Sequence, residues 1–218
     1  MINDARCKHE GSHVLLVEGI DDCHVVRALC NAYAVPETFG VFECGSDQLV
    51  LRRLNALIAS PPSLDAPQVI GVVLDADNNL SGRWDSLKSK IGRYGYVLQD
   101  QPDSSGTILE CSPRLRLGFW LMPNNQLSGL LEHFCMQMID PHIDSYVREV
   151  VVRAQETAGA CSFKTNHFEK AVVHTYLAWQ DEPGYPLGKA ITKQSLRPLT
   201  QTAKVFVAWL NRLFNSPI

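Results

Sequence analysis

Three acidic side chains stand directly after apolar segments of strand length, and their types and positions suit a divalent cation. Glu18 follows the apolar residues 14–17, and Asp75 and Asp77 follow the apolar residues 69–74. Continuous β-branched runs of this kind are typical of parallel strands that are buried on both faces. The carboxyl ends of such strands meet at one edge of an open sheet, where ligands bind. Carboxylates gathered there repel each other unless a hard cation such as Mg²⁺ or Mn²⁺ joins them.

Each of the two motifs has a simpler explanation when it is taken alone. Glu18 and Gly19 could form an ordinary strand-to-helix turn, in which the glycine permits a sharp change of direction. Asp75 and Asp77 could cap a helix or lie in a solvated loop, although in extended geometry their side chains would face the same way. Because both motifs occur in one frame of alternating strands and helices, we predict a shared metal site with Glu18, Asp75 and Asp77 as its ligands.

Other residues near the same predicted edge could support this site. Asp21 or Asp22 would cap the helix that follows the first strand, and Asp22 could enter an outer shell around the metal. Glu43 is the last residue of the second predicted strand and could also lie in the outer shell around the metal, or it could simply be exposed at the edge of the sheet. Arg83 follows the acidic pair and could contact a phosphate group, or it could form a plain surface salt bridge.

The order of predicted elements is that of an α/β protein. We expect strands at residues 14–18, 39–43, 69–74, 95–98, 107–109 and 117–121, and helices at about 21–33, 49–58, 84–91, 127–139, 142–156, 165–179 and 200–214. This order favours a Rossmann-like, mostly parallel sheet flanked by helices, with a helical C-terminal part. We expect a single domain with a core of about residues 12–125 and a helical extension of about residues 126–218.

The bulk composition limits the classes of function. With 218 residues, of which 45% are hydrophobic and 20% charged, the chain can bury one sizeable core. The formal net charge of -3 gives no general basic footprint, so a nucleic-acid partner would need a local patch of positive charge.

Targeting signals and cysteine spacing point to the cytoplasm. There is no run of about 18 apolar residues to span a membrane, and the polar N-terminus does not have the pattern of a signal peptide. The seven cysteines are odd in number and scattered, which predicts reduced thiols in a cytoplasmic protein.

The residues around the acidic motifs resemble a known fold. Leu16-Val17-Glu18-Gly19-Ile20-Asp21-Asp22 and Leu74-Asp75-Ala76-Asp77 are similar to the two signature motifs of the TOPRIM fold, which topoisomerases, bacterial primases, small nucleases and the overcoming-lysogenization-defect nucleases share. The resemblance implies that Glu18 acts as a general acid or base or as a metal ligand. It also implies that Asp75 and Asp77 bind Mg²⁺.

A closer resemblance covers nearly the whole chain. Residues 118–125, 129–134, 174–180 and 183–192 are similar to a bacterial TOPRIM-related family, the domain of unknown function 3226. An acid is expected after Met122-Pro123, and here Asn124-Asn125 follows. Asn124 could still offer a carbonyl oxygen to a second metal. Glu132 could supply the missing charge, or it could lie on a solvated helical face.

Two functions of different classes remain open. The first is a Mg²⁺-dependent hydrolase of phosphodiesters in nucleic acid, a TOPRIM-type nuclease in which Lys189, in a basic C-terminal stretch, contacts phosphate. The second is a non-catalytic TOPRIM-like module that binds protein partners in a bacterial DNA repair or defence system. The acidic pI of about 6.1, the asparagine pair and the lack of a fused ATPase favour the second. A phosphoacceptor receiver domain is excluded because Leu98-Gln99-Asp100 lacks the required hydroxyl group.

Overall fold

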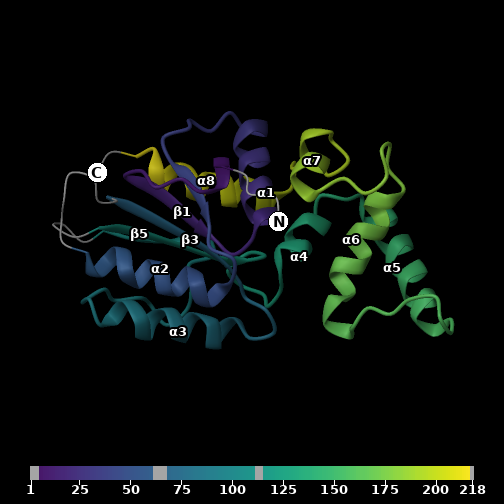
Figure 1. Ribbon diagram of the computed structural model, residues 1–218, viewed down its shortest axis with the longest axis horizontal. Coiled ribbons are helices and arrows are strands. Elements are labelled where there is room, and N and C mark those ends of the chain that lie inside the picture. The colour runs from purple at the N-terminus through teal and green to yellow at the C-terminus, as the bar shows by residue number, and fades with distance from the viewer. Residues whose placement is uncertain (1–4, 61–67, 111–114, 217–218) are drawn as a thin grey trace.

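A five-stranded sheet forms the centre of the computed structural model, which describes residues 5–60, 68–110 and 115–216 (Figure 1). The strands are β1 (His13–Val17), β2 (Gly40–Glu43), β3 (Val69–Asp75), β4 (Thr107–Leu109) and β5 (Arg116–Met122). Their order across the sheet is β2-β1-β3-β5-β4. All neighbours are parallel except β4, which pairs antiparallel with β5. The predicted mostly parallel sheet is therefore confirmed.

The strand predicted at residues 95–98 is wrong. Tyr96 and Leu98 are buried while Val97 is 83% exposed, so the segment has the alternating burial of a strand. The position next to β3 is taken by β5, which pairs with β3 over its whole length. The segment instead forms an irregular stretch after Gly95, and the Tyr96 hydroxyl donates a hydrogen bond of 2.9 Å to the carbonyl of Leu115.

Helices cover both faces of the sheet, as the sequence predicts. The α-helices are α1 (Ile20–Ala32), α2 (Asp47–Ala59), α3 (Leu80–Gly92), α4 (Leu131–Met136), α5 (Pro141–Glu156), α6 (Phe168–Ala178), α7 (Leu187–Thr192) and α8 (Gln201–Phe214), with 3-10 turns η1 (Ala5–Cys7) and η2 (Thr165–His167). Helices α2 and α3 lie on one face, and α1 and α8 lie on the other (Figure 1). None of the described helices is both long and apolar enough to cross a membrane.

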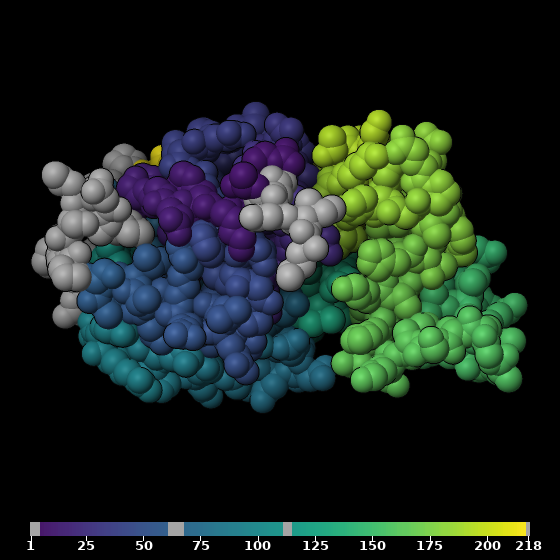
Figure 2. All heavy atoms as spheres, in the orientation of Figure 1, coloured from purple at the N-terminus to yellow at the C-terminus, as the bar shows by residue number. Residues whose placement is uncertain are grey.

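The predicted helical C-terminal part is confirmed, with two differences. The helix expected at 127–139 is shorter, because α4 begins only at Leu131 and ends at Met136. The sequence pattern also missed α7, a short helix between two irregular segments. Figure 2 shows α5, α6 and α7 as a lobe beside the α/β part of the molecule.

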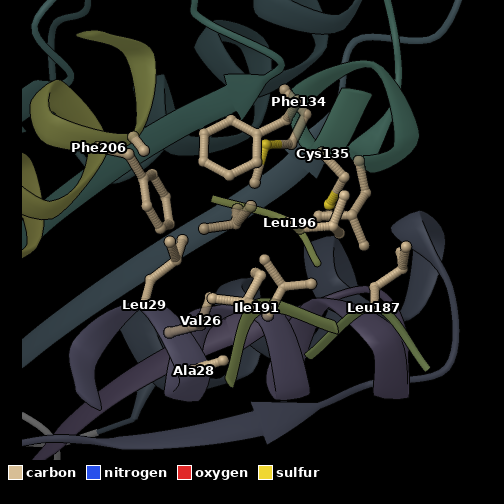
Figure 3. Packing of buried hydrophobic residues seen from close by; sticks show 14 of the residues in the cluster. Val26, Ala28, Leu29, Phe134, Cys135, Leu187, Ile191, Leu196 and Phe206 are labelled. Carbon is tan, nitrogen blue, oxygen red and sulfur yellow. The ribbon is translucent and has the colours of Figure 1, made fainter. Parts of the chain in front are cut away.

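One apolar cluster joins this lobe to the sheet. Leu187 and Ile191 of α7 pack near Val26 and Leu29 of α1, and Phe134 of α4 faces the same space (Figure 3). The same cluster continues into buried valines of α5 and α6 and into the aromatic side chains of α8. The short helix α4 is therefore held in place by this apolar cluster. Its first turn lies at the carboxyl edge of the sheet, where Leu131 contacts Asp75.

The prediction of seven reduced cysteines is wrong for one pair. Cys7 and Cys23 form a disulfide bond, with their Cα atoms 6.0 Å apart. Their approach depends on how the N-terminal segment lies along the sheet, where Lys8 forms an antiparallel bridge with Phe42, and sequence spacing does not reveal this. The free thiols are Cys30, Cys44, Cys135 and Cys161. Cys111 lies outside the described residues.

Helix α8 approaches the sheet so closely that glycine is required beneath it. A Cβ atom on Gly118 of β5 would lie 2.3 Å from Cδ2 of Leu213, a fully buried side chain. We expect Gly118→Ala to lower the free energy of unfolding by about 1–3 kcal/mol, the usual cost of overpacking a core. Gly92→Ala is the matched control for urea denaturation: its Cβ would meet nothing within 4 Å, and the exchange favours the helix by about 1 kcal/mol. Equal stability of the two variants would contradict this packing.

Candidate functional site

Glu18 and Asp75 are joined across the carboxyl edge of the sheet. Glu18 directly follows β1, and Asp75 is the last residue of the neighbouring strand β3. Glu18 Oε1 accepts a hydrogen bond of 2.8 Å from the backbone N–H of Asp75. This bond fixes the Glu18 carboxylate beside the end of β3. The structure thus brings together the first residues of the two motifs, as the strand order predicts.

Asp75 lies where the sheet edge meets α4. Its Oδ1 accepts a hydrogen bond of 2.9 Å from the backbone N–H of Leu131, the first residue of α4. Burial raises the pKa of Asp75 to about 9, and the charges of Asp22, Glu18, Glu132 and Asp77 add to the shift. Four other carboxylates therefore act on this side chain, and it is the centre of the acidic cluster.

Asp22 stands at the start of α1, close to both acids. The helix cap is Gly19, and Asp22 sits three residues later, where its Oδ2 accepts the Gly19 N–H at 2.9 Å. The expectation that an aspartate is the cap residue itself is therefore wrong, and Asp22 instead accepts the N–H of the cap residue from the third position of the helix. Burial, together with the charges of Glu18 and Glu132, raises the pKa of Asp22 to about 7.

Glu132 enters the site from α4. It lies in the first turn of that helix, and its side chain is only 13% exposed. Its charge raises the pKa values of both Asp22 and Asp75, so its carboxylate faces the acidic cluster and is not on a solvated helical face. Lys170 Nζ of α6 lies 3.9 Å from Glu132 Oε1 and places one positive charge at the rim of the cluster.

Asp77 is turned toward a cation on α3. Its φ angle of 51° takes the chain out of extended geometry, so the expectation that Asp75 and Asp77 project from one strand face does not hold. The Asp77 N–H donates to the carbonyl of Gly129 at 2.9 Å, and its carboxylate pairs with Arg83. Arg83 also contacts Asp47 Oδ2 at 2.6 Å. Arg83 thus forms salt bridges, the alternative to a phosphate contact.

Asp47 is a member of this edge that the sequence analysis missed. It opens α2 just after Ser46, whose hydroxyl caps that helix by accepting the N–H of Leu49 at 3.3 Å. Its hydrogen bond from Arg83 lowers the pKa of Asp47. The signal was present in the sequence, because Asp47 also follows a strand whose carboxyl end reaches the same edge.

Three predicted supporting residues are engaged elsewhere. Glu43 forms an ion pair of 2.6 Å with Lys8. Asn124 Oδ1 accepts the backbone N–H groups of residues 126 and 127 at 3.1 and 3.0 Å, which folds the loop after β5. Lys189 of α7 pairs with Glu182 at 2.5 Å. Each of these side chains stabilises its own loop or surface.

The donor atoms at this edge fit a hard cation in type. They are carboxylate oxygens, which Mg²⁺ and Mn²⁺ prefer, and an ionised carboxylate keeps acceptor capacity after it has accepted one N–H group. Within the described ranges, no three His, Cys, Asp or Glu side chains are already gathered into a metal-binding group. The side chains of Glu18, Asp75 and Asp77 would therefore have to reorient to share one cation.

Fold and site together define an α/β protein with an acidic cluster at the carboxyl edge of a mostly parallel sheet. The chain belongs to the family described as protein of unknown function DUF3226, whose model matches residues 12–215. No curated protein matches the chain. Among solved structures, it is similar to the C-terminal region of the Burkholderia pseudomallei OLD protein, with a TM-score of 0.36 and 14% identity over 91% of this chain and 87% of that one.

Proposed function

We propose that the chain is a Mg²⁺-dependent phosphoryl-transfer enzyme that hydrolyses nucleic acid, a nuclease of the TOPRIM type. The observation that carries the proposal is the hydrogen bond of 2.8 Å between Glu18 and the backbone of Asp75, with three further carboxylates acting on Asp75. An acidic cluster of this kind suits the binding of a divalent cation. The resemblance of both motifs to those of TOPRIM enzymes supports phosphodiesters as the substrate.

Each residue has a defined part in this proposal. Asp75 and Asp77 would hold the cation, and Glu18 would either bind a second cation or move the proton. Asp22 and Glu132 would complete the negative field around the cation. A bound Mg²⁺ supplies a Lewis acid for the phosphate oxygens and lowers the pKa of a water molecule.

Glu18 is the residue suited to move the proton. Burial raises its pKa above the ordinary value, against the lowering effect of the Asp75 N–H group. A carboxylate whose pKa is closer to neutral is a better general base at physiological pH. Its anchored position at the end of β1 would direct its second oxygen without a change in the fold.

Two cations flank the acidic cluster and could receive the phosphate group. Lys170 is 54% exposed beside Glu132, and Arg83 lies on the opposite side against Asp77. If Asp77 turns to the bound metal ion, the Arg83 guanidinium loses one of its two carboxylate partners, Asp77 and Asp47. It would then present two N–H groups in the geometry that binds phosphate oxygens well.

The experiment compares cleavage by Glu18→Gln with cleavage by the wild type. Single- and double-stranded DNA and RNA are incubated with each protein in Mg²⁺ or Mn²⁺. We expect Glu18→Gln to lower the rate by about 10²–10⁴, the usual contribution of a general acid or base. Glutamine keeps a side-chain oxygen for the Asp75 N–H group, so the fold should survive, as a thermal melt would show.

Asp100→Asn is the matched control, because that carboxylate is fully exposed and pairs with Lys88 on α3. It should cleave like the wild type. Wild-type protein that cleaves no strand in either metal, or a Glu18→Gln variant with full activity, would contradict the proposal. The first of these results would favour the non-catalytic module that binds a protein partner.

A further inference from the structure

A second polar pocket lies beyond the far end of α4. It has a volume of about 560 Å³ and lies between the start of α5, the end of α6 and the segment that joins α7 to α8. Lys193 and Arg197 line it, together with the side chains of Gln137, Gln180 and Gln194. No residue of the acidic cluster takes part, so this is a separate feature of the surface.

The wall that carries the two cations is held in place. Between them, Leu196 is fully buried and lies among the side chains of α4 and α7 (Figure 3). The Arg197 N–H donates to the carbonyl of Met138 at 3.0 Å. The Tyr176 hydroxyl donates to the carbonyl of Ser195 at 2.8 Å. The backbone between Lys193 and Arg197 is therefore fixed by the burial of Leu196 and by these two hydrogen bonds.

The cations themselves have exposed side chains. Within the part of the chain that the structure describes, neither Lys193 nor Arg197 forms an ion pair within 4.0 Å. One acid, Asp140, also lines the pocket, where it caps α5 by accepting the His142 N–H at 2.9 Å, and Glu182 pairs with Lys189. In a chain with a net charge of -3, two such cations at one pocket form a local site for anions.

An exposed aromatic pair comes from α5 and the end of α6, close in the chain to residues that line the pocket. Tyr146 is 59% exposed and Trp179 is 48% exposed, and their ring centroids are 5.9 Å apart. Trp179 precedes Gln180 of the pocket wall, and Tyr146 lies one helical turn after Ile143, which also lines the pocket. Exposed aromatic rings and exposed cations are the parts from which single-strand binding sites are made.

We propose that this surface binds single-stranded nucleic acid, with phosphates at Lys193 and Arg197 and bases stacked on Trp179 and Tyr146. The proposal rests on the proposed function, since it assigns the substrate strand of the acidic site. Helix α4 links the two places: its first N–H group binds Asp75, and Gln137 just after its last residue lines the pocket. Six residues of α-helix span about 9 Å, so a strand of a few nucleotides can reach both.

The tryptophans provide a direct test. The chain has four, of which Trp84, Trp120 and Trp209 are fully buried, so quenching of fluorescence on contact with a base reports on Trp179. We would titrate the full chain with single-stranded oligothymidylate and oligouridylate in EDTA. Quenching by either strand supports the proposal, and the tighter of the two identifies the preferred strand. Absence of quenching by both, or equal affinity for a DNA duplex, would overturn it.

Two charge variants test the phosphate contacts. Lys193→Gln/Arg197→Gln should weaken binding at least tenfold and reduce the slope of log affinity against log salt by about 1.4, since each phosphate contact on a single strand contributes about 0.7. Lys90→Gln/Arg93→Gln, at the C-terminal end of α3 and just after it, removes the same charge away from the pocket and should leave both values unchanged. Equal effects of the two double variants would mean that only net charge matters and would overturn the site.

The aromatic contact is tested by the anisotropy of a labelled oligothymidylate. Trp179→Ala should bind about tenfold more weakly, and Trp179→Phe, which keeps a ring, should bind much as the wild type does. Unchanged binding by Trp179→Ala would overturn the stacking.

All of these measurements are made without metal, so a failure of Mn²⁺ binding would count against the proposed nuclease alone. A protein that binds Mn²⁺ but no single strand would count against this surface alone.

Discussion

Asp75→Asn is expected to abolish Mn²⁺ binding while it raises the melting temperature of the metal-free protein. The Asp75 carboxylate is partly buried among four other acids, and burial and their charges raise its pKa to about 9. Asparagine keeps an oxygen to accept the Leu131 N–H group, which Asp75 now binds at 2.9 Å. The variant thus removes the carboxyl group that would ionise to bind the cation and keeps the bond that joins β3 to α4.

Calorimetry and thermal melts measure the two effects. We expect the Mn²⁺ affinity to fall at least about a hundredfold, which is about 2.7 kcal/mol. We expect the free energy of unfolding in EDTA to rise by at least about 1 kcal/mol, which corresponds to about 2–4 °C for a chain of this size. A mutation that merely damages the fold lowers both the Mn²⁺ affinity and the free energy of unfolding. A lower affinity together with a higher stability would therefore identify Asp75 as a ligand of the cation. Unchanged Mn²⁺ binding would contradict the site.

Asp77→Asn provides a graded comparison. Because Asp77 is 55% exposed and already paired with Arg83, we expect it to lower the Mn²⁺ affinity less than Asp75→Asn does. Asp100→Asn, at a remote and fully exposed carboxylate, should change neither affinity nor stability. A larger loss at Asp77 than at Asp75 would mean that the cation binds at the loop and that Asp75 is only a structural acid.

Local patterns in the sequence predict most of the fold. The runs before Glu18 and Asp75 are long, apolar and β-branched, and they form β1 and β3 at the centre of the sheet. The error at residues 95–98 has a physical cause. Alternating burial is satisfied equally by a strand and by a coil that points every second side chain into the core, and only the pairing of β3 with β5 decides between them. Such pairing is a long-range property that a local pattern does not contain.

The acidic site is predictable to the same degree. Strand order places Glu18 and Asp75 at one edge, because parallel neighbours end together. The directions in which the Asp77 and Glu132 side chains point could not be predicted from the sequence. The positive φ of Asp77 turns it toward Arg83, and Glu132 reaches Asp75 only because α4 docks its first turn against β3. Both depend on tertiary contacts, in which a helix and a loop far apart along the chain meet the end of a strand.

The acidic cluster also predicts how stability depends on pH. Burial and neighbouring carboxylates raise the pKa values of Asp22 and Asp75 to about 7 and about 9 from the ordinary value of 3.8. A carboxyl group with a raised pKa binds more protons in the folded state, so its stabilising contribution is complete below about pH 4 and is lost as the pH rises through the raised value. We therefore expect the metal-free protein to lose stability from about pH 5 to pH 9, by on the order of 1 kcal/mol per pH unit.

Mn²⁺ should reverse this trend, because a cation replaces the protons that otherwise neutralise the cluster. In urea unfolding at a series of pH values, we expect the stabilisation by Mn²⁺ to be larger at pH 8 than at pH 6.

Calorimetry in two buffers of different ionisation enthalpy should show that protons are released when Mn²⁺ binds, and that more are released at pH 6 than at pH 8. In Asp75→Asn the loss of stability between about pH 7 and 9 should flatten, since Asp22 has already ionised by then. A wild-type protein whose metal-free stability rises from pH 5 to 9 would show that the acids at this edge do not share one buried cluster.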